Sequence, residues 1–125
     1  MKRLPLIWVL ILMAVGCGRP VAAAQFGSLI VRVAAGPTCP VETAGDPACA
    51  PRPVNGARLR LEGPSETTLV SDATGIARSD RVVVGSYQLM PEPVTGLMSA
   101  PAPMQIEIRR GETTVVTVTY DTGIR

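Results

Sequence analysis

Apolar and polar residues alternate along most of the chain after residue 25. The segment 57–62 (ARLRLE) shows this most plainly, because Ala57, Leu59 and Leu61 alternate with charged residues. Successive side chains of a β-strand point to opposite faces of its sheet, so a period of two predicts strands with one buried face. The same alternation predicts further strands in the segments 29–33, 67–71, 82–91, 104–110 and 113–120.

Residues that favour turns separate these segments, namely Gly63, Pro64, Asp72, Gly75 and Gly111. Gly111 predicts a tight hairpin between the last two strands, and Gly85 predicts a bulge or a break within the segment 82–91. No segment outside the N-terminus has a helical period. Short strands at this spacing predict an all-β domain over residues 27–125, an antiparallel Greek-key β-sandwich of about seven strands.

The first 16 residues have a different pattern. Lys2 and Arg3 precede an apolar run, from Leu4 to Val15, that only Pro5 interrupts. A membrane-spanning helix needs about 20 apolar residues, so this run is too short to span comfortably. A basic start, a short apolar run and small residues after it are typical of a secretory signal, which we place at residues 1–16.

Two cleavage sites follow the apolar run. Residues 14–17 (AVGC) resemble the lipobox of bacterial lipoproteins, although Ala14 stands where a larger aliphatic residue is usual. The resemblance implies cleavage before Cys17, which would carry the lipid, and makes residues 17–26 a tether. The alternative is ordinary signal peptidase cleavage after Ala24, which would release a soluble secreted protein.

Loss of the signal changes the charge of the chain. The full sequence has 12 basic and 10 acidic residues, and Lys2 and Arg3 leave with the signal, so the mature chain has a formal net charge of zero. The remaining basic residues are dispersed arginines, which gives no indication of nucleic-acid binding.

The mature chain lacks the residues that several classes of catalytic and metal site require. The sequence has no histidine, and Lys2 is its only lysine. The mature chain therefore lacks the residues for Ser–His triads, His-ligated zinc and lysine Schiff bases. Asp46, Asp72 and Asp80 lack the spacing of a calcium loop, so we expect no metal, no cofactor and no enzymatic activity.

The few aromatic residues and two isolated glutamates exclude further kinds of binding site. Phe26, Tyr87 and Tyr120 are the only aromatic residues after the signal, which disfavours modules that stack sugars or bases. Glu42 and Glu92 stand alone in proline-rich segments and are expected to be solvated.

Cys39 and Cys49 lie in an exported protein, so we expect them to form a disulfide. They lie within the segment 36–53, which is rich in proline and too long for a simple turn. A second proline-rich segment, residues 90–103, either contacts a partner or crosses between the two sheets.

Residues 53–94 resemble the carboxypeptidase regulatory-like domain, a prealbumin-like β-sandwich. The matching residues are Gly56, the turn 70–75 (VSDATG) and the segment 85–89 (GSYQL). The resemblance implies structural roles for Gly56, Asp72, Gly75, Gly85 and Tyr87. Ser71 departs from it, where threonine is usual, and so does Val84, where proline is usual.

Together these features predict a non-enzymatic, exported, lipid-anchored binding or structural module at the bacterial cell envelope. One alternative is an inhibitor or chaperone-like partner of a secreted enzyme that uses the Cys39–Cys49 loop or residues 90–103. Another is a hydrolase with an unrecognised carboxylate site.

Overall fold

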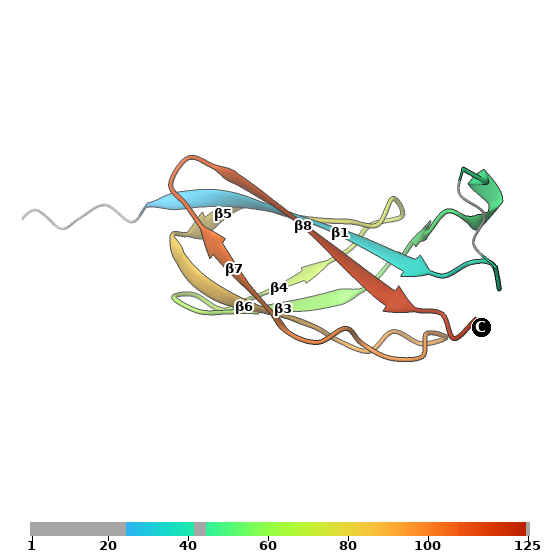
Figure 1. The fold of residues 1–125 in the computed structure, drawn as a ribbon. Coiled ribbons are helices and arrows are strands. Elements are labelled where there is room, and N and C mark those ends of the chain that lie inside the picture. The colour runs from blue at the N-terminus through green and yellow to red at the C-terminus, as the bar shows by residue number, and fades with distance from the viewer. Residues whose placement is uncertain (1–24, 42–44, 125) are drawn as a thin grey trace, which may run out of the picture.

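The computed structural model describes residues 25–41 and 45–124, which form a two-layer β-sandwich (Figure 1). The predicted signal, both cleavage sites, Cys17 and Glu42 lie outside the described residues. The elements are β1 (Phe26–Gly36), η1 (Pro47–Cys49), β2 (Arg52–Pro53), β3 (Arg58–Glu62), β4 (Thr67–Val70), β5 (Ile76–Val83), β6 (Gly85–Pro91), β7 (Met104–Ile108) and β8 (Thr113–Asp121).

The two sheets differ in how their strands pair. One sheet has the order β4-β3-β6-β7 and is antiparallel throughout. In the other, β2 and β5 pair antiparallel with different parts of β1, and β8 pairs with β1 in parallel over nine residue pairs. The predicted β-sandwich is confirmed, and the β1–β8 pair is its one parallel exception. Alternation within a strand does not depend on the direction of its neighbour, so the apolar pattern does not indicate this parallel pairing.

The predicted buried faces form the core between the sheets. Leu29, Leu59, Leu61 and Ile108 are completely buried, and Val118 lies among them on β8. Met104 and Val116 are partly buried and pack against this core. Strands from both sheets therefore contribute one face each, as the period of two predicted.

Two predicted connections are wrong. Residues 109–112 do not close a hairpin, because β7 and β8 belong to different sheets and the turn carries the chain from one to the other (Figure 1). Residues 92–103 do not cross between sheets, because they join β6 and β7, which are neighbours in one sheet. Glycine and proline mark where a chain turns, but the sheet it turns into is decided by long-range packing.

Candidate binding site at the loop end of the sandwich

The two proline-rich loops lie at the same end of the sandwich. The Cys39–Cys49 loop follows β1 and the loop 92–103 follows β6, and both lie beside the C-terminus (Figure 1). Phe26, where the described chain enters β1, lies at the opposite end. We call the end formed by residues 37–41, 45–57, 71–75, 92–103 and 122–124 the loop end.

The Cys39–Cys49 loop is held by its disulfide and by local hydrogen bonds. The two Cα atoms are 5.2 Å apart across the bond, as expected for a disulfide. The Thr38 hydroxyl donates to the Ala50 carbonyl at 3.2 Å. Asp46 caps η1 by accepting from the Ala48 N–H at 2.9 Å. These contacts hold the two ends of the loop, residues 38–39 and 46–50, against each other.

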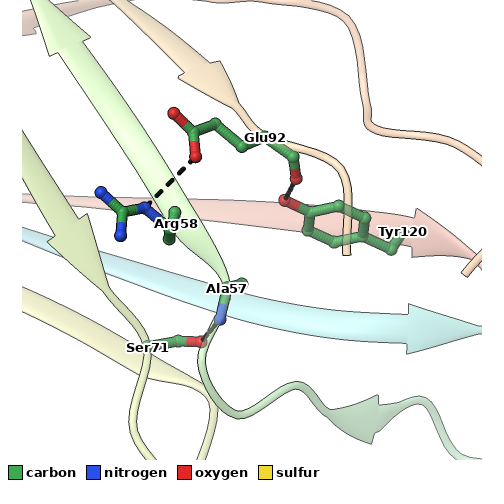
Figure 2. Close-up of polar contacts among 5 residues, drawn as sticks. All are labelled: Ala57, Arg58, Ser71, Glu92 and Tyr120. Carbon is green, nitrogen blue, oxygen red and sulfur yellow. Dashed lines mark hydrogen bonds and ion pairs between the residues drawn. The ribbon is translucent and has the colours of Figure 1, made fainter. Parts of the chain in front are cut away.

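The start of the loop 92–103 is fixed to both sheets through Glu92. The Tyr120 hydroxyl of β8 donates to the Glu92 carbonyl at 2.6 Å (Figure 2). Arg58 of β3 forms an ion pair with the Glu92 carboxylate at 3.3 Å, and the Glu92 N–H donates to the Arg58 carbonyl at 2.9 Å. Glu92 therefore does not stand alone as the sequence suggested, although its side chain is still 37% exposed to solvent. Its ion-pair partner is 34 positions earlier in the sequence and is brought close by the pairing of β3 with β6.

The rest of this loop covers the open side of the core. Val94 and Leu97 are partly buried against the core, and the Met98 N–H donates to the Asp121 carbonyl at 2.9 Å. The Met98 side chain points outward and is 69% exposed. Backbone hydrogen bonds and the packing of Val94 and Leu97 thus hold the loop in place. The exposed Met98 side chain remains accessible for contact.

Burial of Tyr120 is expected to make the stability of the folded protein decrease at alkaline pH. Burial, and then the nearby Glu92 carboxylate, raise the pKa of Tyr120 above its usual value of 10.0. The folded protein holds this proton more tightly than the unfolded chain. The resulting stabilisation is therefore complete below about pH 10 and is lost as the pH rises through the folded-state pKa.

We expect the free energy of unfolding to fall above about pH 10, and the Tyr120→Phe variant to lack this part of the fall. Denaturant titrations of both proteins at a series of pH values between about 8 and 11 measure the difference. The same alkaline slope in both proteins would show that Tyr120 does not cause it.

The connection between β2 and β3 is fixed by a buried serine. Ser71 is 3% exposed, and its hydroxyl donates to the Val54 carbonyl at 2.6 Å and accepts from the Ala57 N–H at 2.9 Å (Figure 2). The Gly56 N–H donates to the Ser71 carbonyl at 2.8 Å, and Gly56 has a φ of 77°. The resemblance marks Ser71 only as a departure and does not indicate this role.

The neighbouring turn is organised by Asp72. Its carboxylate accepts from the Thr74 hydroxyl at 2.6 Å, from the Thr74 N–H at 2.9 Å and from the Ile76 N–H at 3.0 Å. The Thr74 hydroxyl is the main cause of a lowered pKa of Asp72, followed by the Ile76 N–H. Gly75 ends the turn with a φ of 77°, and its carbonyl accepts from the Val33 N–H of β1 at 2.7 Å.

A shallow hollow of about 310 Å³ lies between the loop 92–103 and the chain around β2. Its lining is mainly apolar with a few polar groups, and comprises Ala35, Arg52, Pro53, Val54, Asn55, Val94, Thr95, Leu97 and Thr122. Arg52 forms no ion pair within the described part of the chain. Such a surface can receive an apolar side chain and donate a few hydrogen bonds around it.

No group of three metal-ligating residues is present among residues 25–41 and 45–124. In the same residues no helix is long and apolar enough to cross a membrane.

The residues singled out from the sequence fall into two groups. Cys39, Cys49, Gly56, Asp72 and Gly75 all belong to the loop end. Gly85 and Tyr87 instead lie where the chain changes sheets between β5 and β6, and the Tyr87 hydroxyl donates to the Val83 carbonyl at 2.6 Å. Tyr87 is 2% exposed and belongs to the core rather than to a binding surface.

No family model matches the chain, and no curated protein is similar to it, so its resemblance to the carboxypeptidase regulatory-like domain stays a prediction. Solved structures do share its fold. They include the Bacillus anthracis TIE protein (TM-score 0.61, 17% identity), the minor pilin GBS52 of Streptococcus agalactiae (0.58, 18%) and the major pilin SpaD of Corynebacterium diphtheriae (0.59, 15%).

The matched region is 78% of this chain in each case, but only 16%, 45% and 32% of those three proteins. The chain thus spans less than half the length of each of these three proteins. At these identities the likeness shows the fold alone.

Proposed function

We propose that this chain is an exported, lipid-anchored β-sandwich module of the bacterial cell envelope that binds another protein through its loop end. One observation carries the proposal: both proline-rich loops lie at the same end of the sandwich, opposite the start of β1 (Figure 1). The predicted tether joins the domain at Phe26, so the anchor and the binding surface lie at opposite ends.

The length of β1 gives the separation between these ends. β1 has 11 residues, and at about 3.3 Å a residue it extends roughly 35 Å from the tether to the Cys39–Cys49 loop. A lipid chain on Cys17 would hold the domain at the membrane surface. The loop end then lies well clear of the point of attachment and is accessible to a partner.

The chemistry of the loop end favours a protein as the partner. Val41 is 78% exposed and Met98 is 69% exposed, so both large apolar side chains are accessible to a partner. The prolines and the disulfide hold both loops in shape, so little conformational entropy is lost on binding. Exposed aromatic side chains that would stack sugar rings are absent from the described loop end.

The anchor and the partner can be tested in one host. We expect the wild-type protein in the membrane fraction with a lipid-modified N-terminus at Cys17, and the Cys17→Ser variant in the soluble fraction. Intact mass spectrometry identifies the N-terminus. A mature mass that begins at Gln25 and carries no lipid would refute the anchor.

A pull-down from membranes with the anchored form is expected to retain a protein partner in stoichiometric amount. If that partner is a secreted enzyme whose activity falls on binding, the inhibitor alternative is supported instead.

A further inference from the structure

The β1-centred sheet has an open edge at β8. β8 pairs with β1 alone, and residues 97–99 reach only its last residue, where Met98 and Ser99 contact Asp121. Within the described residues, no backbone hydrogen bond outside the β1 pairing reaches the strand from Thr113 to Tyr120. This edge therefore presents a row of unpaired backbone N–H and C=O groups.

The other sheet edges carry features that discourage pairing. β2 has two residues, one of them Pro53, and β4 has only four. β7 carries the exposed Glu107 and follows a proline-rich loop. β5 carries Arg78 and Asp80, and its register with β1 shifts between Gly27 and Leu29. Short length, proline, charge and irregular register are the usual protections of an edge strand.

β8 has none of these protections. It is nine residues long, and the segment from Thr113 to Tyr120 contains no charged residue, proline or glycine. Its register with β1 is unbroken. Its outer face is exposed and includes Val115, which is 55% exposed. An edge of this composition is suited to the addition of another strand.

We propose that β8 pairs antiparallel with β8 of a second copy of this chain, so that the two β1-centred sheets become one. Centred on Val116, the pairing sets Val115 opposite Thr117 and Thr113 opposite Thr119. Every one of these pairs consists of β-branched residues, which stabilise cross-strand contacts. The edge is self-complementary because no charge lies between residues 113 and 119, and the mature chain has a formal net charge of zero.

The proposal is independent of the loop end and of the lipid anchor. The pairing uses backbone groups of β8, and the two copies carry their loop ends in opposite directions along the joined sheet. The tether of residues 17–25 spans about 30 Å when extended, so both copies of a dimer that lies along a membrane can keep their anchors inserted.

A charge exchange on the exposed face tests the register. Residues 115 and 117 of one copy face residues 117 and 115 of the other. The Val115→Lys/Thr117→Lys variant therefore sets lysine opposite lysine twice, whereas Val115→Lys/Thr117→Glu sets lysine opposite glutamate twice. We expect the first to weaken dimerisation at least about tenfold and the second to retain it.

Sedimentation velocity of the mature protein in detergent-containing buffer, from about 1 µM to 1 mM, measures the dimer. Gln88→Lys, on β6 of the other sheet, is the control and should behave as the wild type. Circular dichroism checks that each variant is folded. A wild type that is monomeric throughout, a lysine–lysine variant that dimerises as well as the wild type, or two folded double variants that are both monomeric would each overturn the proposal.

Discussion

The Gly75→Ala variant is expected to lose about 2–4 kcal/mol of unfolding free energy. Gly75 has a φ of 77°, a conformation that costs other residues about 1–2 kcal/mol. A Cβ at this position would also collide with the Val33 carbonyl oxygen and approach the Pro53 Cβ to 2.9 Å. Both neighbours belong to the β1–β2 region that supports the loop end, so relief of the collision would displace it.

Gly111→Ala is the matched control for this prediction. Gly111 has a φ of 69°, but a Cβ there would meet nothing within 4 Å. The loss of unfolding free energy in Gly111→Ala should therefore come from backbone strain alone, about 1–2 kcal/mol. Denaturant unfolding of both variants separates strain from collision. Equal losses in the two would mean that the contacts of Gly75 with Val33 and Pro53 are unimportant.

The free energy of unfolding of the Cys39→Ser/Cys49→Ser variant is expected to be about 2–3 kcal/mol lower than that of the wild type, because the disulfide restricts the unfolded chain. The bond joins residues separated by 10 positions. The unfolding free energy decreases by this full amount only if the folded loop keeps its conformation without the disulfide. The hydrogen bonds of Thr38 and Asp46 favour this.

Denaturant unfolding of wild type and variant measures the loss, and alkylation with and without reductant checks the bond itself. An unchanged midpoint in the double variant, or identical alkylation of the wild type with and without reductant, would contradict the prediction.

The strands were predictable where apolar residues alternate, as at Leu59 and Leu61, because that pattern is local. The first half of β5 was not predicted, since Arg78 and Asp80 interrupt the apolar period there. The parallel pairing of β8 and the sheet change at Gly111 depend on packing between distant segments. The sequence carries no local signal for either.

The candidate site was predictable only in parts. The two proline-rich segments and the Cys39–Cys49 bond follow from composition, but their position at one end follows from the path of β1 through the sandwich. The bond from Tyr120 to Glu92 spans 28 positions and crosses between sheets, so neither residue shows it in the sequence. Glu92 stands alone in the sequence, and only the pairing of β3 with β6 brings Arg58 to it.

Site-specific photo-crosslinking in intact cells tests the central claim most directly. Four exposed large apolar residues of the described chain provide matched positions: Val41 and Met98 lie at the loop end, whereas Val70 and Val115 lie on strands. With a photoreactive residue at each position in turn, we predict a crosslink to a different protein from positions 41 and 98 and none to that protein from position 70. Position 115 is predicted to crosslink to a second copy of the chain. Crosslinks to one partner from position 70 but not from 41 or 98 would contradict the loop end as the binding surface.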